Sequence, residues 1–277
     1  MSKQENKKSN NASARGTAVI TLALLAVSCL SILVFSTKAT AQVEPKTAVR
    51  NILLVHGAWV DGSSWAKVIP ALEAKGLNVV SVQIPLTSLA DDVAATKRAI
   101  VLVDGPVLLV GHSYGGVVIT EAGNDPKVKG LVYIAAFAPD AGESAVTLLK
   151  TVPDSPVGTE LRPDSSGFLK LTEKGVDEDF AEELSAPEKK ILFATQIPTS
   201  VNALGAPVSQ AAWKTKPSWF LLTTKDRVIP VELGRNMAHK LNAETVEVSS
   251  CHAVVAAHPE EVSSLIIKAG QAGGGPR

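Results

Sequence analysis

The chain has 277 residues, of which 45% are hydrophobic and 19% are charged, and its formal net charge at pH 7 is +0. This composition is typical of a globular protein with enough apolar side chains for one substantial core. After the first 41 residues there are 22 basic and 26 acidic side chains, so the charge gives no sign of a nucleic-acid or anionic-membrane partner.

The N-terminal segment has the pattern of a targeting sequence. A polar, basic start precedes an apolar run over residues 18–35, and Ala39-Thr40-Ala41 follows as a cleavage site of small residues. The pattern predicts a signal peptide over residues 1–41, cleaved before Gln42, and export to the periplasm or out of the cell. The alternative is an uncleaved membrane anchor, because 18 apolar or small residues can just span a bilayer. Lipidation at Cys29 is a weaker interpretation, since the apolar run continues past that cysteine.

The first expected strand, residues 51–55, runs into His56-Gly57-Ala58-Trp59. Gly57 lets this loop pass close to a neighbouring nucleophile, so the backbone N–H of Ala58 can donate to an oxyanion formed during reaction. We expect His56 to hold the loop through hydrogen bonds rather than to act in catalysis. Trp59, beside the loop, is interpreted as a wall of the substrate pocket.

Helix and strand signals alternate through residues 63–103. Apolar residues at helical spacing predict a helix over residues 63–75, either bent by Pro70 or with Pro70 in its first turn. Residues 78–83 form the second expected strand. Ser88 and Asp91 form a variant of the capping box, which predicts a second helix over residues 89–103.

Residues 106–121 contain the motif around which the rest of the chain is organised. An apolar run ends at Val110, Gly111-His112-Ser113-Tyr114-Gly115 follows, and a second apolar run can start a helix. This is G-x-S-x-G between a strand and a helix, as the nucleophile elbow of a serine hydrolase requires. The sharp turn holds the serine in strained backbone, exposes the Ser113 hydroxyl, and directs the Tyr114 N–H at any oxyanion formed there.

Composition changes between residues 139 and 217, where prolines, charges and small residues are mixed and no buried apolar strand is found. An insertion of this length after an expected strand, residues 130–136, predicts a cap over the active site. Short helices are expected at residues 173–184 and 186–195. Apolar side chains of the cap are predicted to supply the acyl-group pocket, namely Phe168, Leu169, Phe180, Leu184 and Phe193.

The core resumes with an expected strand over residues 218–222, which leads to Asp226. A helix over residues 231–241 and a strand over residues 245–249 follow, and this strand leads to Cys251 and His252. A last helix is expected over residues 259–269. We expect Cys251 to be a small buried side chain rather than a reactive thiol.

Alternating strands and helices predict an α/β fold with a doubly wound, mostly parallel sheet of about six strands, which places ligands at the carboxyl ends of the strands. Ser113, Asp226 and His252 each follow such a strand, in the chain order Ser, Asp, His. They form the predicted catalytic triad, in which the histidine takes the serine proton and the carboxylate stabilises the imidazolium. His258 is the second candidate for the base, and Asp140 is the second candidate for the acid.

A family resemblance is carried by several runs of sequence: His56-Gly-Ala-Trp59, Asp61-Gly-Ser-Ser-Trp65, Pro85-Leu-Thr-Ser-Leu-Ala-Asp-Asp92, Gly111-His-Ser-Tyr-Gly-Gly116, Thr224-Lys-Asp-Arg-Val-Ile-Pro230 and His252 to His258-Pro259. Over residues 51–270 the chain resembles the α/β-hydrolases, in particular small bacterial esterases related to plant methylesterases and hydroxynitrile lyases. The resemblance implies an α/β-hydrolase domain over residues 42–277 with a small inserted cap at about 139–217. It also implies a serine esterase.

Two departures from that family narrow the chemistry. Hydroxynitrile lyases of the group carry a threonine and a lysine where this chain has Gly57 and Ala253, which disfavours cyanohydrin cleavage. Ser113 disfavours the dehalogenase and epoxide hydrolase branches, whose nucleophile is an aspartate. The sequence has no zinc-type cluster, P-loop or dinucleotide fingerprint, so no cofactor and no metal are implied.

The sequence therefore predicts hydrolysis of a small-molecule carboxylic ester through an acyl-enzyme. The alternatives are a lactonase or other acyl hydrolase, which would use the same residues, and a catalytically silent binding protein of the same fold. No nucleic-acid partner is expected, and no membrane partner beyond the alternative N-terminal anchor.

Overall fold

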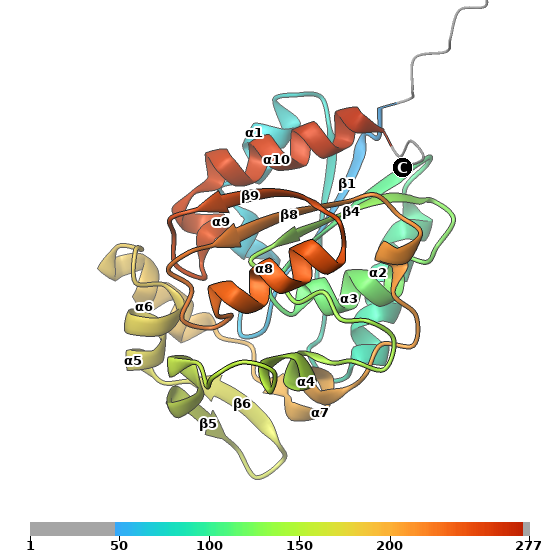
Figure 1. Ribbon diagram of the computed structural model, residues 1–277. Coiled ribbons are helices and arrows are strands. Elements are labelled where there is room, and N and C mark those ends of the chain that lie inside the picture. Colours follow the sequence, from blue (N-terminus) through green and yellow to red (C-terminus); the bar gives the residue numbers. More distant parts are fainter. Residues whose placement is uncertain (1–47, 274–277) are drawn as a thin grey trace, which may run out of the picture. The chain divides into compact units, whose positions relative to one another are not determined.

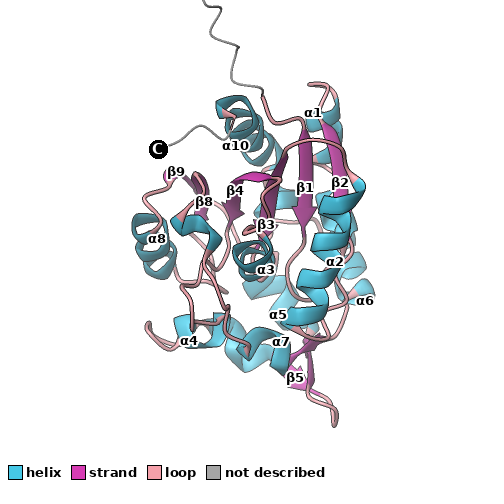
Figure 2. Cartoon of the chain, turned by 90° about the vertical axis from the view of Figure 1, so that its right-hand side faces the viewer, coloured by secondary structure: helices cyan, strands magenta, loops and turns pink. Residues whose placement is uncertain are grey.

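Six parallel strands form the central sheet in the order β2-β1-β3-β4-β8-β9 (Figures 1 and 2). The computed structural model describes residues 48–273 of the chain, so the predicted signal peptide lies outside the described residues. The strands are β1 (Asn51–Val55), β2 (Asn78–Val82), β3 (Val107–His112), β4 (Val128–Ile134), β8 (Ser218–Thr223) and β9 (Glu244–Val248). The predicted α/β fold with about six parallel strands is confirmed.

The chain order reverses between β1 and β3, the two strands that precede the expected oxyanion loop and the expected nucleophile. From β1 the chain moves outward to β2, then returns to place β3 on the other side of β1. Such a reversal leaves a crevice outside the carboxyl ends of the two strands. The residues that follow β1 and β3 therefore meet at the natural ligand site of this sheet.

Helices cover both faces of the sheet. Successive side chains of a strand point to opposite faces, so every residue of β1 and β3 is buried. Leu53 and Val55 pack in one cluster with α2 (Leu89–Leu102), α3 (Gly115–Ala122) and α8 (Val231–Lys240). Ile52 and Leu54 pack in a second cluster with α1 (Ile69–Glu73) and α10 (Pro259–Ala272). Figure 1 shows α1 and α10 on one side of the sheet and α2, α3 and α8 on the other.

The helix expected over residues 63–75 is two separate pieces. Gly62–Trp65 is a single 3₁₀ turn, η1, and α1 begins only at Ile69, with Pro70 in its first turn. Proline has no N–H to donate, so it fits the first turn of a helix but not its interior. The prediction of one continuous helix was therefore wrong, and the placement of Pro70 in a first turn is confirmed.

Between β4 and β8 the chain forms the segment that we call the cap, residues 139–217. Its helical pieces are α4 (Ala145–Leu149), η2 (Pro156–Glu160), α5 (Glu173–Gly175), the π-helical turn η3 (Val176–Phe180), α6 (Ala186–Thr195), α7 (Val201–Gly205) and η4 (Ala212–Lys214). It also contains an antiparallel sheet of three short strands, β5 (Leu161–Pro163), β6 (Phe168–Leu171) and β7 (Thr199–Ser200), which the sequence did not predict. The helix expected at 173–184 ends at Phe180.

The C-terminal part of the described chain adds a short helix, α9 (Val254–Ala257), directly after His252. Cys251, which precedes it, is fully buried, as expected. Within residues 48–273, no helix combines the length and the apolar character needed to cross a membrane.

Candidate active site

Ser113 lies in the tight turn between β3 and α3. Its φ is +53°, in the left-handed region that residues with a β-carbon rarely adopt, so the expected strain is present. A Cβ added to Gly111 would lie 2.6 Å from the carbonyl carbon of Gly115, because the strand and the helix meet so closely. Only glycine fits there, and this closeness keeps the turn sharp enough to raise Ser113 above the sheet.

His252 lies between Ser113 and Asp226 and is hydrogen-bonded to both. Its Nε2 atom is 2.8 Å from Ser113 Oγ, and its Nδ1 atom is 2.8 Å from Asp226 Oδ2. The three residues come from the loops after β3, β8 and β9, up to 139 positions apart in the chain. The structure therefore brings together the three side chains that the sequence singled out.

The last residue of β8 and the loop after it surround the Asp226 carboxylate with donors. Thr223 donates its hydroxyl at 2.7 Å, and the backbone N–H groups of Val228 and Ile229 donate at 2.8 Å each. Burial opposes ionisation of Asp226, but His252 and these donors outweigh it and hold the pKa of the carboxyl below its ordinary value. An ionised carboxylate only accepts, so His252 Nδ1 carries the proton and Nε2 is left to accept from Ser113.

The loop after β1 lies directly against the serine. A Cβ added to Gly57 would come within 2.7 Å of Ser113 Cβ, so the two turns touch at this point. Among the described residues, no acceptor is found for the backbone N–H of Ala58 or of Tyr114. Two N–H groups beside the serine are thus available to an oxyanion, and that of Tyr114 lies just before the first residue of α3, where the helix dipole adds to its effect.

The Tyr114 side chain is anchored to a buried carboxylate that the sequence analysis missed. The Tyr114 hydroxyl donates to Asp92 Oδ2 at 2.8 Å, and the Leu86 N–H donates to Asp92 Oδ1 at 2.7 Å. Asp92 is fully buried, and burial raises the pKa of its carboxyl to about 6. The sequence did offer a signal, because Asp92 falls in line with the apolar face of the helix α2, four residues before the buried Thr96.

Two other histidines, His56 and His112, support the site, and neither side chain is hydrogen-bonded to Ser113. His56 Nδ1 is 2.9 Å from Gly57 O, and its Nε2 accepts from the Ile84 N–H at 3.1 Å, so it holds the loop as expected. His112 packs beneath His252 with ring centroids 5.0 Å apart and donates from Nε2 to the His252 carbonyl at 3.0 Å. Burial lowers the pKa of His112 to about 3, so it is neutral.

The alternative acid and base lie in other contacts. His258 faces Glu183 at 3.4 Å and Glu261 at 3.6 Å, and Asp140 forms an ion pair with Lys214. Neither is hydrogen-bonded to Ser113 or His252 in the part of the chain that the structure describes. No group of His, Cys, Asp or Glu side chains in residues 48–273 is arranged to hold a metal ion.

The cap covers His252 and the loops on either side of it. The Phe180 ring stands edge-on to the His252 ring at 5.0 Å, and the Phe180 carbonyl accepts from the Ala253 N–H at 3.0 Å. Asp179 accepts from Arg227 Nε at 2.7 Å, which ties the cap to the Asp226 loop. With the cap in this place, Ser113 is only 2% exposed.

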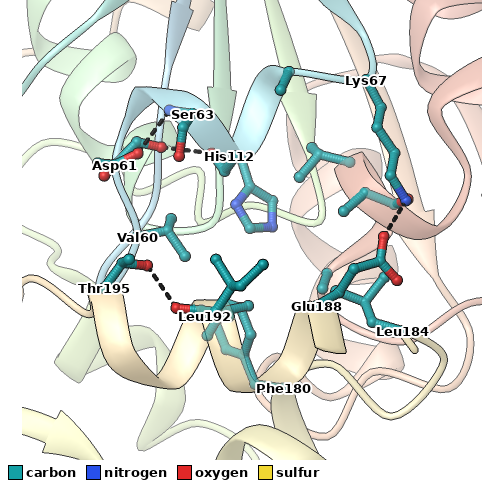
Figure 3. Close-up of a pocket in the computed structure, with 16 residues that line it drawn as sticks. Val60, Asp61, Ser63, Lys67, His112, Phe180, Leu184, Glu188, Leu192 and Thr195 are labelled. Carbon is teal, nitrogen blue, oxygen red and sulfur yellow. Dashed lines mark hydrogen bonds and ion pairs between the residues drawn. The ribbon is translucent and has the colours of Figure 1, made fainter. Parts of the chain in front are cut away.

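A cavity of about 190 Å³ lies between η1, α6 and α9, with His112 and Phe180 in its wall (Figure 3). Figure 3 shows His112 in the middle of its wall and the 2.6 Å ion pair of Lys67 and Glu188 at one side. The lining is mostly apolar and consists of Val60, Asp61, Ser63, Ser64, Ala66, Lys67, His112, Phe180, Leu184, Glu188, Ile191, Leu192, Thr195, Ala253, Val255 and Ala256. The cavity adjoins Ser113 and His252 through their sequence neighbours His112 and Ala253.

The predicted pocket residues divide into two groups. Phe180 and Leu184 line this cavity, whereas the other apolar candidates do not: Phe168, Leu169, Phe193 and Trp59. Trp59 is buried instead against the cap, with its ring edge-on to Phe180 at 6.1 Å and its indole N–H donating to the Leu169 carbonyl at 3.1 Å. In this structure Trp59 is therefore a contact between the loop after β1 and the cap, and it does not line the cavity.

Comparison with known proteins agrees with this fold. Salicylic acid-binding protein 2 of Nicotiana tabacum is 24% identical over 259 residues, covering 79% of this chain and 96% of that protein. The pyrethroid hydrolase of Sphingobium wenxiniae is 26% identical, covering 79% of this chain and 86% of that protein. A carbendazim-hydrolysing esterase of Nocardioides sp. is 37% identical, but over 115 residues that make up 36% of this chain and 47% of that protein.

Solved structures and a family model extend the comparison. A pyrethroid hydrolase from Sphingobium faniae superposes with a TM-score of 0.70 and 22% identity, covering 81% of this chain and 98% of that one. The model of the alpha/beta hydrolase family matches residues 52–265, which include both loops and all three hydrogen-bonded residues. The resemblance noted in the sequence is thereby confirmed, and the chain belongs to the α/β hydrolase family.

Proposed function

We propose that the protein is a serine hydrolase that cleaves small carboxylic esters through an acyl-enzyme intermediate. The observation that carries the proposal is the pair of 2.8 Å hydrogen bonds that join Ser113 Oγ, His252 and Asp226 Oδ2. At the level of reaction class, the protein is a carboxylic ester hydrolase, since its relatives include a carbendazim-hydrolysing esterase, plant methylesterases and a pyrethroid hydrolase.

In the first half-reaction, Ser113 Oγ attacks the ester carbonyl carbon while His252 Nε2 takes the hydroxyl proton. Asp226 holds the Nδ1 proton and stabilises the imidazolium. The carbonyl oxygen becomes an oxyanion, which accepts from the N–H groups of Ala58 and Tyr114. When the tetrahedral intermediate collapses, the bond to the alcohol oxygen breaks and His252 returns the proton to the alcohol.

In the second half-reaction, a water molecule replaces the alcohol. His252 takes a proton from the water as its oxygen attacks the acyl carbon, and the same two N–H groups stabilise the second oxyanion. Collapse breaks the bond to Ser113 Oγ, which recovers its proton from His252, and the carboxylic acid leaves. The steps use only the described residues, the ester and water.

The cavity beside the triad supports a small substrate. Its volume of about 190 Å³ is modestly larger than the about 150 Å³ of an engineered protein cavity that holds benzene. A short acyl chain or a single ring would fill it, and we propose that Phe180 and Leu184 contact that group. The lactonase alternative uses the same residues, because a lactone is a cyclic ester.

A cyanohydrin lyase is disfavoured by the geometry as well as by the sequence. A threonine at position 57, as in that branch of the family, would place its Cβ 2.7 Å from Ser113 Cβ in this backbone. The close approach of this loop to the serine therefore suits glycine at position 57.

The test uses Ser113→Ala, a fluorophosphonate probe and a series of p-nitrophenyl esters of increasing acyl length, with methyl esters and lactones alongside. The wild-type protein is expected to be labelled and to hydrolyse the short esters, because an activated serine reacts with the probe. Ser113→Ala is expected to lose both the labelling and the ester hydrolysis, while its circular dichroism spectrum stays unchanged. A wild-type protein that neither labels nor turns over would establish the silent binding protein instead, and full activity in Ser113→Ala would overturn the mechanism.

A further inference from the structure

The oxyanion loop contains a strained residue directly after its proposed donor. Trp59 follows Ala58 and has a φ of +64°, in the left-handed region that is unfavourable for a side chain with a β-carbon. Such a conformation persists only where the surrounding structure holds it. The contacts that hold Trp59 therefore decide the shape of the loop next to Ala58.

The backbone N–H and the indole N–H of Trp59 both donate to one pair of facing residues on strands β6 and β7 of the cap. Its backbone N–H donates to Thr199 Oγ1 at 3.1 Å, and its indole N–H donates to the Leu169 carbonyl at 3.1 Å. Leu169 on β6 and Thr199 on β7 are register partners across the antiparallel pair. Thr199 is fully buried, and its hydroxyl donates to the Ile197 carbonyl at 3.5 Å.

The same cap strand also supports the second proposed donor. The Ser200 N–H donates to the Leu86 carbonyl at 2.9 Å, and Leu86 is itself left-handed, with a φ of +59°. The Leu86 N–H donates to Asp92, which accepts the Tyr114 hydroxyl. Strand β7 thus contacts the segments that hold both proposed donors. Its Ser200 N–H bonds to Leu86, on the Tyr114 side, and its Thr199 hydroxyl bonds to Trp59, next to Ala58.

We propose that Thr199 is a positioning residue for the oxyanion loop. Its hydroxyl fixes the Ala58–Trp59 peptide plane, and only the two backbone dihedral angles of Ala58 separate that plane from the one that carries the Ala58 N–H. The Thr199 hydroxyl thereby aims the Ala58 N–H at the reacting carbonyl, without touching the substrate. This inference rests on the proposed function, because it requires an oxyanion to form beside Ser113.

The experiment compares Thr199→Val with Thr199→Ser. Valine matches the shape of threonine and removes the hydroxyl, whereas serine keeps the hydroxyl and removes a methyl group. An oxyanion donor that is present but misdirected is expected to lower kcat by roughly 10- to 100-fold in Thr199→Val, with KM little changed, because the lost interaction is made only in the transition state. Affinity for a trifluoromethyl ketone, which forms a tetrahedral adduct on the serine, is expected to fall by the same factor.

The conservative variant and a matched control complete the test. Thr199→Ser is expected to restore most of kcat and of the trifluoromethyl ketone affinity. Thr159→Val makes the same change at an exposed threonine whose hydroxyl bonds only to Pro156 O, and it is expected to leave both values unchanged. If KM rises and kcat does not fall in Thr199→Val, or if serine fails to rescue, Thr199 is only a packing residue of the cap.

Hydrogen exchange in the wild-type protein gives a second measurement that does not depend on how the valine variant folds. The chain has four tryptophans, so ¹⁵N-tryptophan labelling isolates their backbone amides, and Trp59→Phe assigns the signal. The Trp59 amide is expected to be protected, and a freely exchanging amide would overturn the proposal.

The failure of this role can be told apart from the failure of the proposed function. If the probe labels the wild-type protein at Ser113 but Thr199→Val has the same kcat as the wild type, only the role of Thr199 is overturned. If the wild-type protein is neither labelled by the probe nor hydrolyses the esters, both the proposed function and the role of Thr199 are overturned.

Discussion

At position 57, the absence of a side chain lets the loop after β1 approach Ser113. A Cβ there would lie 2.7 Å from Ser113 Cβ and 3.2 Å from both Nδ1 and O of His112, so either the loop or the serine turn must move. Since a misplacement of about 1 Å can cost on the order of 100-fold in rate, we predict that Gly57→Ala loses roughly that factor in kcat/KM on short p-nitrophenyl esters.

Gly158→Ala is the matched control for this prediction. A Cβ added at Gly158 meets nothing within 4 Å, and its backbone is not left-handed, so its kinetics and melting temperature are expected to match the wild type. Wild-type activity in Gly57→Ala would mean that the loop can retreat from Ser113 without loss. It would remove the main argument for a donor on Ala58.

The buried carboxyl of Asp92 should make the free energy of unfolding depend on pH. Its folded pKa is raised to about 6, so between about pH 4 and 6 the folded protein binds more protons at this site than the unfolded chain does. Stability therefore falls as pH rises through this window, and the full penalty of a buried carboxylate is present above it. Asp92→Asn does not titrate, and its amide can still accept from Leu86 and donate to the Tyr114 oxygen.

The measurement is the free energy of unfolding of Asp92→Asn minus that of the wild type, from urea melts across the window. We expect this difference to rise by up to about 3 kcal/mol from about pH 4 to pH 7, at about 1.4 kcal/mol for each unit of pKa shift. A difference that does not change with pH would show that Asp92 ionises as an exposed aspartate does.

Residues of the site differ in how far the sequence could reveal them. Ser113, Asp226 and His252 could be found because each follows a predicted strand, and the glycines around Ser113 mark a sharp turn. Thr199 could not be found in this way. It meets Trp59 across 140 positions, from a two-residue strand whose partner is another short strand of the cap. Such a contact depends on tertiary packing and leaves no local pattern.

Among the elements, those with strong local patterns were predictable and those held by the cap were not. All six core strands could be predicted, for two reasons. The inner strands β1, β3, β4 and β8 are buried and almost wholly apolar runs, whereas the more exposed edge strands β2 and β9 are rich in the β-branched residues valine and threonine. The cap strands are two to four residues long, too short for an alternating pattern to be recognised. The helix expected at 173–184 ends at Phe180 in the π-helical turn η3, and the Phe180 ring stands edge-on to His252.

The cavity lined by His112 and Phe180 leads to a prediction about the side chain of Leu184 in the cap. Leu184 lines the cavity and is proposed to touch the acyl group, so Leu184→Ala enlarges the space and is expected to shift preference toward longer acyl chains. Changes of this size in an apolar pocket alter discrimination by about 1–3 kcal/mol, or roughly 10- to 200-fold in the ratio of kcat/KM values. The measurement is kcat/KM across the p-nitrophenyl ester series.

Phe168→Ala is the control, because Phe168 is also apolar and in the cap but lies on β6 outside the cavity. Its expected effect is a uniform change for all chain lengths. If Leu184→Ala also lowers kcat/KM equally for every ester, in step with a lower melting temperature, then Leu184 only packs the cap and the acyl group binds elsewhere.

In the described chain as a whole, cap and sheet share one apolar core. Phe180, Val176 and Leu171 of the cap belong to the same buried cluster as Trp59 and the sheet residue Val55. Exposed ion pairs such as Lys67–Glu188 contribute only about 0–1 kcal/mol each, so apolar burial supplies most of the attachment. This explains how a cap with few long elements can still hold Trp59 and cover His252.

We also propose that the mature chain begins at Gln42, after removal of a signal peptide over residues 1–41. The basic start, the apolar run and Ala39-Thr40-Ala41 support cleavage at this point. Strand β1 begins at Asn51 and the family match at residue 52, so cleavage leaves every described element of the hydrolase in place. A chain produced from Gln42 onward is therefore expected to fold and to hydrolyse short esters with the kcat of the exported protein.

Mass spectrometry of the protein recovered from the producing cells tests this directly. We expect the N-terminal peptide of the exported fraction to begin at Gln42, either as glutamine or in its cyclised form. Replacing Ala39 and Ala41 by bulky residues should block processing, because the peptidase accepts only small side chains at these two positions. An intact Met1 terminus in the membrane fraction, with full esterase activity there, would instead establish the uncleaved anchor, since the apolar run of 18 residues is long enough to hold the enzyme at a bilayer.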